Sequence, residues 1–205
     1  MEQLILEASV TTEDTKQLED RVIYQLTNKG KLRAGEVYDL WKGDIVIVYK
    51  IYISDEPEII ITEDVLKVTF NGDMEKVRNL AKVNTPRMCP ISFRGMYETL
   101  MEISDLVLAP SDEPEKMYVL RNTTGKHGAT CILYPGIIEL IRTKVEGNFW
   151  IMPSSIHEWI ILVDDGFKKE AVKKIICDVN AREVTYSDYL SDDPLYCKGD
   201  EIICG

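Results

Sequence analysis

The sequence contains few of the residues that build metal or redox centres. Its five cysteines include no Cys-x-x-Cys pair, and its two histidines are His127 and His157. A structural zinc site needs four ligands at closer spacing, and an odd number of scattered cysteines does not indicate a disulfide framework. We therefore expect reduced thiols, no metal and no cofactor.

Long apolar runs are also missing, and positive charge is scarce. No stretch approaches the roughly 20 apolar residues that a membrane-spanning helix needs, and the first residues lack the basic flank of a signal peptide. Lys and Arg number 24 against 35 Asp and Glu, which gives a formal charge of −11. Such a charge repels nucleic-acid backbones and anionic lipid surfaces. The sequence predicts a cytoplasmic protein that binds neither nucleic acid nor membranes.

The residues that are present indicate a folded α+β protein. Apolar residues make up 45% of the chain and charged residues 29%, which argues against disorder. We predict a mixed or antiparallel sheet built from hairpins, with amphipathic helices packed on it. The acidic, proline-containing stretch 109–116 predicts a linker between an N-terminal half, residues 1–108, and a C-terminal half, residues 117–205. One continuous domain is the alternative.

The first half contains one clear hairpin pattern. Residues 45–53 are β-branched or aromatic almost throughout, which favours a buried strand. Residues 58–61 follow a turn and fit its antiparallel partner. Residues 21–28 fit either a helix or a strand.

Capping residues predict the helices of the first half. Thr62 and Asp73 are typical N-caps, and the apolar residues after Asp73 recur at helical spacing. This second helix should end by Thr85, because Pro86 disfavours helical geometry in the residue before it. A third helix is predicted over residues 96–106.

The second half is predicted to contain two hairpins, each followed by a helix. The strands cover residues 117–120, 130–134, 149–152 and 159–163. Turn residues lie at 122–128 and at Pro153–Ser155, and Pro135-Gly136 suits the start of the first helix. The last helix spans 167–180, and its expected inward residues are Phe167, Ala171, Ile175 and Val179.

The densest group of catalytic residue types lies at residues 154–158. Ser154, Ser155, His157 and Glu158 supply hydroxyls, an imidazole and a carboxylate, the groups of a nucleophile, a base and an orienting acid. In an extended segment Ser155 and His157 share one face while Glu158 points to the other, so an acid from elsewhere would be required. We favour turn hydrogen bonding for the serines and keep a hydrolase as an alternative hypothesis.

The turn at 122–128 has the composition of a phosphate-binding loop. It lacks the spacing of a Walker A motif, and an apolar run follows it where that motif has a helix. It supports a third hypothesis, the binding of a small phosphorylated ligand. The candidate ligand-binding residues are Asn122, Gly125, Lys126, His127 and Gly128.

Acidic pairs flank several turns, where solvated charge is their simplest explanation. If the pairs share one face, they can dock on a basic partner surface, and Trp41 in its polar stretch is a candidate exposed anchor. The candidate partner-binding residues are Trp41, Asp164, Asp165, Asp192 and Asp193. Because no catalytic set is complete, the leading hypothesis is a non-catalytic accessory or inhibitory protein that presents an acidic surface to a basic protein partner.

Short motifs at six places carry a family resemblance. They lie at Ile61–Leu66, Asn84–Arg87, Gly128–Gly136, Ile151–Glu158, Val179-Asn180 and Leu190–Asp192. This pattern resembles an uncharacterised bacterial family, a domain of unknown function found mainly in Gram-positive anaerobes. The resemblance covers residues 22–196 and implies an architecture and an interest in residues 153–158, without implying a reaction. The N-terminus looks shorter than in typical members, and residues 31–36 depart from the family pattern.

Overall fold

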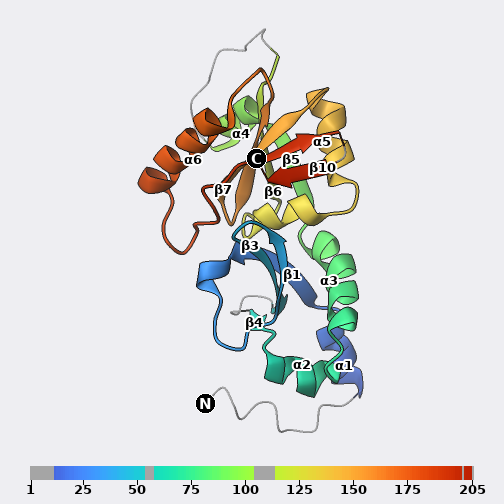
Figure 1. Ribbon diagram of the computed structural model, residues 1–205. Coiled ribbons are helices and arrows are strands. Elements are labelled where there is room, and N and C mark those ends of the chain that lie inside the picture. Colours follow the sequence, from blue (N-terminus) through green and yellow to red (C-terminus); the bar gives the residue numbers. More distant parts are fainter. Residues whose placement is uncertain (1–11, 54–57, 104–113, 200, 205) are drawn as a thin grey trace.

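Two antiparallel sheets and the helices around them make up the structure, which confirms the predicted α+β class (Figure 1). The structure is a computed structural model that describes residues 12–53, 58–103, 114–199 and 201–204. In chain order its elements are α1 (Thr12–Glu19), β1 (Val22–Asn28), η2 (Lys29–Lys31), β2 (Tyr38–Lys42), β3 (Ile45–Ile51), β4 (Ile59–Ile60), α2 (Glu63–Phe70), α3 (Met74–Met88), β5 (Ile91–Gly95), α4 (Met96–Ile103), β6 (Met117–Asn122), η3 (Gly128–Leu133), α5 (Ile137–Val145), β7 (Phe149–Ser155), β8 (Glu158–Val163), α6 (Lys169–Glu183), β9 (Leu195–Lys198) and β10 (Glu201–Cys204).

β3 is the central strand of the four-stranded sheet, whose order is β1-β3-β2 with β4 also paired to β3. The predicted strand over 45–53 is confirmed as β3, which ends two residues earlier, at Ile51, and its hairpin is confirmed by the pairing of Lys50 opposite Ile60. The ambiguous segment 21–28 forms β1, which runs antiparallel to β3. The segment forms a strand because its residues pair with those of the buried strand β3.

The outer edge of β1 is bonded by side chains instead of another strand. The N–H of Tyr24 donates to Thr85 Oγ1 at 3.0 Å, and the N–H of Leu26 donates to Thr130 Oγ1 at 3.2 Å. Thr85 belongs to α3 and Thr130 to η3, so each half of the chain supplies one hydroxyl. A buried N–H without a partner costs on the order of 1–3 kcal/mol. These two bonds therefore tie both halves to the same strand.

The predicted helix starts at Thr62 and Asp73 are confirmed, whereas α5 begins only at Ile137, so Pro135 does not occupy its first position. Thr62 Oγ1 accepts from the Val65 N–H at 3.3 Å, and Asp73 Oδ1 accepts from the Lys76 N–H at 2.9 Å. Gly136 directly precedes α5 with a φ of 77°, a left-handed conformation that suits glycine.

The predicted end of α3 is wrong, because the helix continues through Pro86 to Met88. Pro86 has no N–H and removes one intrahelical bond. Bonds to other elements compensate for this loss. The Asn84 amide donates to the Val22 carbonyl at 3.1 Å, and the Thr85 hydroxyl binds β1. Tertiary contacts thus hold the last turn in a helix that the local sequence disfavours.

The six-stranded sheet has the order β10-β9-β7-β8-β6-β5. β5 precedes residue 108, yet it pairs with β6, where Phe93 lies opposite Leu120. Strand pairing therefore crosses the predicted boundary between the halves. Residues 104–106 of the predicted third helix and most of the linker 109–116 lie outside the described residues.

The predicted second hairpin of the C-terminal half is confirmed as β7 and β8, but its bend is misplaced. Pro153–Ser155 lie within β7, and the turn falls at Ile156 and His157. Pro153 is tolerated within the strand next to a register shift between Pro153 and Ser155.

The predicted strand over 130–134 is wrong, because these residues belong to η3 and its C-cap. The segment is apolar because it is buried, not because it pairs in a sheet. The N–H of Ala129 donates to the Ile156 carbonyl at 3.2 Å, and Trp159 Nε1 donates to the Ala129 carbonyl at 2.5 Å. A short buried apolar run looks the same in a strand and in a turn of helix.

The helix α6 is present, but its predicted inward face is wrong. Val172, Ile176 and Asn180 are buried, whereas Ile175 and Val179 are 46% and 44% exposed. The two rows are offset by one residue, which is about 100° around a helix, and periodicity cannot choose between them. The buried row packs on Trp150, Met152 and Leu162 of the six-stranded sheet. Phe167 and Ala171, which were also predicted to face inward, are exposed, and the exposed fraction of Phe167 is 43%.

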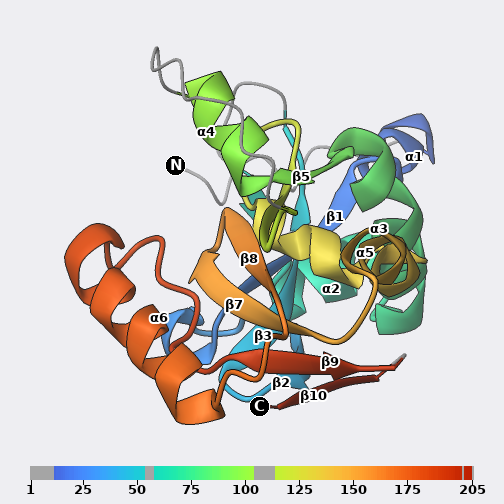
Figure 2. The ribbon, with the colours of Figure 1, turned by 90° about the horizontal axis from the view of Figure 1, so that it is seen from above.

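The six-stranded sheet is covered on both faces. Figures 1 and 2 show α6 on one side of β7 and β8 and α5 on the other. Residues alternate accordingly along β7: Trp150 and Met152 pack against α6, whereas Phe149 and Ile151 belong to the main core. That main core continues into the four-stranded sheet through Tyr24 and the other buried residues of β1 and β3.

We expect Gly128→Ala to destabilise the protein strongly. A Cβ at residue 128 would lie 2.3 Å from the His157 carbonyl oxygen and 2.6 Å from the Asn122 nitrogen. Overpacking of this kind costs about 1–3 kcal/mol or more. Gly147→Ala is the matched control, because nothing lies within 4 Å of its Cβ position. Urea denaturation of both variants checks this, and equal stabilities would contradict the close packing at Gly128.

Candidate functional site

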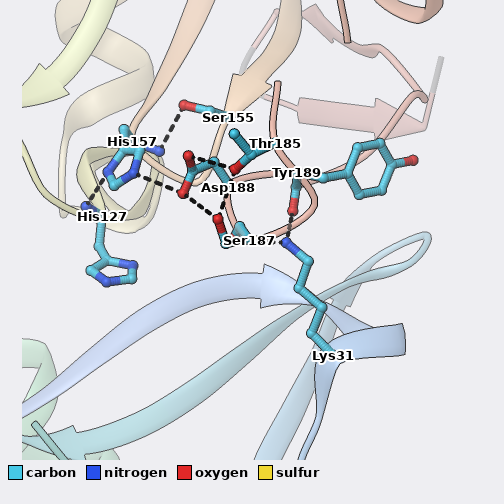
Figure 3. Close-up of polar contacts among 8 residues, drawn as sticks. All are labelled: Lys31, His127, Ser155, His157, Thr185, Ser187, Asp188 and Tyr189. Atoms are coloured by element: carbon cyan, nitrogen blue, oxygen red, sulfur yellow. Dashed lines mark hydrogen bonds and ion pairs between the residues drawn. The ribbon is translucent and has the colours of Figure 1, made fainter. Parts of the chain in front are cut away.

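The two histidines of the chain lie side by side, although they come from different predicted sites. The backbone N–H of His127 donates to His157 Nδ1 at 3.1 Å, and the ring centroids lie 5.8 Å apart (Figure 3). The turn at 122–128 and the β7–β8 turn therefore form one junction. In the sequence they are separate candidates, because only the strand pairing brings β6 beside β8.

Both ring nitrogens of His157 are engaged. Nδ1 accepts a hydrogen bond, so the neutral ring carries its proton on Nε2, which lies 3.4 Å from Asp188 Oδ1. Asp188 lies between α6 and β9 and also accepts from the Thr185 hydroxyl at 2.9 Å. That hydroxyl and then His157 hold the pKa of Asp188 below its usual value, against partial desolvation. No sequence pattern around Asp188 predicts that it is the carboxylate partner of His157.

The two candidate serines bond elsewhere. Ser155 Oγ accepts from the backbone N–H of His157 at 3.0 Å, and Ser154 Oγ donates to Glu158 Oε1 at 3.4 Å. Asp188 supplies the carboxylate that a triad requires from another part of the chain. Neither serine hydroxyl, however, is hydrogen-bonded to the imidazole of His157. The geometry supplies a base and an orienting acid without a nucleophile, and the hydrolase stays a prediction.

The polar groups of the turn at 122–128 mostly bond one another. The Asn122 amide donates to the Lys126 carbonyl at 2.7 Å, and the Thr124 hydroxyl donates to Asn122 Oδ1 at 3.0 Å. Gly125 supplies a left-handed turn residue, with a φ of 72°, and Gly128 allows the close approach to His157. Backbone donors of this turn are used as well, because the N–H groups of Thr123, Lys126 and His127 donate to the Pro90 carbonyl, Thr124 Oγ1 and His157 Nδ1. Lys126 and His127 are its remaining candidates for ligand contact.

A cavity of about 560 Å³ opens beside this turn, between the edge of β1, the end of α3 and η3. We call it the large cavity. The lining residues used below are Tyr24, Gln25, Glu58, Cys89, Lys126 and His127. Its volume is within the range typical of small-molecule sites.

Three residues that line the large cavity each carry a buried polar atom with no hydrogen-bond partner among the described residues. These atoms are Tyr24 Oη, Gln25 Oε1 and His127 Nδ1. Tyr24 is 6% exposed and Gln25 is 4% exposed, so solvent at the surface does not reach them freely. The Gln25 amide nitrogen donates to Glu58 Oε1 at 2.6 Å, which fixes Oε1 as an acceptor. Buried polar atoms without partners are uncommon in folded proteins.

Three of the titratable side chains that line the large cavity are neutral near neutral pH. Burial, and then the charge of Lys50, lower the pKa of His127 to about 4, so its ring is neutral. Burial raises the pKa of Tyr24 well above its usual value, and its hydroxyl stays protonated. Burial, and then the charge of Glu58, raise the pKa of Cys89, which disfavours a thiolate nucleophile.

The candidate partner-binding residues mostly have partners within the chain. Asp164 accepts from the Tyr196 hydroxyl at 2.6 Å, and Asp165 pairs with Lys116 at 2.7 Å. Similarly, Asp192 accepts from the Asn180 amide, and Asp193 pairs with Lys173. Trp41 is half-buried, not fully exposed, with its ring 6.1 Å from that of Trp159. Partner binding through these residues stays a prediction.

Neither a metal centre nor a membrane-spanning helix is found within the described ranges. Within them, no group of three His, Cys, Asp or Glu side chains is arranged to hold a metal ion. None of the helices in these ranges combines the length and the apolar character that a bilayer crossing requires.

We expect the stability contribution of His127 to depend on pH. Its folded pKa of about 4 lies below the unfolded value of about 6.5. The contribution is therefore fully present above about pH 6.5 and decreases as the pH falls toward 4.

His127→Asn tests this, because asparagine tolerates the left-handed backbone of residue 127, whose φ is 52°. Between pH 7 and pH 4.5 the free energy of unfolding of the wild type should fall further than that of the variant, by on the order of 2 kcal/mol. Parallel pH curves from urea denaturation would show that burial does not perturb this imidazole.

Comparison with known proteins places the chain in a family. No curated protein and no solved structure matches it. Residues 5–197, which include both sheets up to β9 and the whole histidine junction, match the family described as a family of unknown function, DUF5688. The chain therefore belongs to the DUF5688 family.

Proposed function

We propose that this protein binds a small polar molecule in the large cavity. The observation that carries the proposal is that three residues lining one cavity each hold a buried polar atom without a partner among the described residues: Tyr24 Oη, Gln25 Oε1 and His127 Nδ1. A ligand with a donor facing Gln25 and an acceptor facing Tyr24 would satisfy two of them. The cytoplasmic location predicted from the sequence is part of this proposal.

Ligand binding is better supported by the geometry than the two other hypotheses. A hydrolase would need a nucleophile beside His157, and both serines bond other groups. An accessory protein that docks through its acids would need them free, and the four predicted acids have partners in the chain. A cavity lined by unsatisfied polar atoms needs no such rearrangement.

We expect Tyr24→Phe to leave the free energy of unfolding of the ligand-free protein unchanged or to raise it by up to about 1 kcal/mol. The reason is that the variant removes a buried hydroxyl that has no partner among the described residues. Tyr134→Phe is the matched control, because the Tyr134 hydroxyl donates to the Cys89 carbonyl at 2.7 Å. The control should lose about 1 kcal/mol. Urea denaturation measures both, and equal losses would mean that Tyr24 is bonded within the protein.

We expect a bound ligand to protect Cys89 from alkylation. Cys89 lines the large cavity and is half-buried, whereas Cys177 is half-buried on α6 and does not line it. Free sugars, sugar phosphates, nucleosides and amino acids are added singly, and iodoacetamide labelling of each cysteine is followed by peptide mass spectrometry at mildly alkaline pH. A compound at ten times its Kd should slow labelling of Cys89 about tenfold and leave Cys177 unchanged. Unchanged labelling of Cys89 with every compound would contradict the proposal.

A further inference from the structure

A second, smaller cavity adjoins the large one. It has a volume of about 200 Å³, and we call it the small cavity. Gln25 and His127 line both cavities. These two side chains therefore form a shared wall, and each carries one of the polar atoms without a partner among the described residues.

Three basic side chains line the small cavity, in a protein whose formal charge is −11. They are Lys31, Arg33 and Lys50, and the one acid that lines the cavity with them is Glu36. Lys50 is paired with Glu58 at 3.0 Å, and Glu36 accepts from the backbone N–H of Arg33 at 3.0 Å. Lys31 and Arg33 carry the positive charge that these carboxylates do not pair.

The position of Lys31 is fixed by its own hydrogen bonds. Its ammonium group donates to the carbonyls of Ser187 and Tyr189, so it reaches from η2 to the loop that carries Asp188 (Figure 3). An ammonium group has three donors, and these bonds leave one of them for a ligand. A charge that is held in place before binding loses little freedom when an anion arrives.

Arg33 supplies a complementary kind of donor. Its side chain is exposed, and no ion pair of its guanidinium is found within the described residues. A guanidinium presents a planar fork of N–H donors that matches two phosphate oxygens. The segment that follows β1 thus contributes two of the basic groups of this cavity, Lys31 and Arg33.

We propose that the small cavity binds the phosphate group of a small phosphorylated ligand whose uncharged part occupies the large cavity. This inference rests on the proposed function and names its ligand class. Lys31 and Arg33 contact the phosphate, and the shared wall of Gln25 and His127 contacts the atoms next to it. The phosphate is thereby assigned to the segment 31–33 and not to the turn at 122–128, whose polar groups bond one another.

Titration with inorganic phosphate, followed by phosphorus NMR, tests this assignment in the full-length protein. Arg33→Gln should weaken phosphate binding about tenfold, because it removes a charge-assisted bond. Arg33→Lys should restore part of the affinity. Arg182→Gln on α6 is the matched control for loss of one exposed arginine and should bind phosphate like the wild type. Circular dichroism checks that each variant is folded.

Three results would overturn the assignment. They are the absence of phosphate binding by the wild type, equal affinities of the Arg33→Gln and Arg182→Gln variants, and tighter binding of acetate than of phosphate, which would indicate a carboxylate site. The Cys89 labelling experiment separates this failure from that of the proposed function. If uncharged sugars or nucleosides protect Cys89 while phosphate does not bind, the large cavity is a ligand site and the phosphate subsite is wrong.

Discussion

The two threonine bonds at the open edge of β1 hold the arrangement on which the candidate site depends. A further strand would have used the N–H groups of Tyr24 and Leu26 in a ladder, as sheet edges usually do when they are covered. Thr85 and Thr130 use them instead, from a helix and from a short 3-10 segment. Side-chain bonds satisfy the edge without filling the space beside it, and the large cavity lies in that space.

The histidine junction links this edge to the C-terminal loop. His127 has a left-handed backbone, and its N–H donates to Nδ1 of His157. The same residue lines both cavities. His157 continues the contact to Asp188, and Lys31 reaches the same loop from η2, which follows β1. Strained non-glycine residues of this kind are often found at binding sites, where the surrounding contacts hold them.

Much of the secondary structure was predictable, because its signals are local. Thr62 and Asp73 cap helices through bonds to residues three positions later, and a run as β-branched as 45–53 fits few structures other than a strand. The errors occur where a contact with a residue distant in the sequence determines the end of a helix or its buried face. α3 passes Pro86 because Asn84 and Thr85 bind β1, and the face of α6 is set by Trp150 and Leu162 on the sheet.

The sequence by itself determined the α+β class, the caps at Thr62 and Asp73, and the β3–β4 and β7–β8 hairpins. Only the tertiary structure decided that His127 meets His157, that Asp188 joins them, and that Tyr24 and Gln25 line a cavity. The physical reason is the separation along the chain of the residues that interact. A cap or a turn is satisfied within a few residues, whereas a cavity is formed by side chains far apart in the chain and depends on which backbone edges remain open after the sheets have paired.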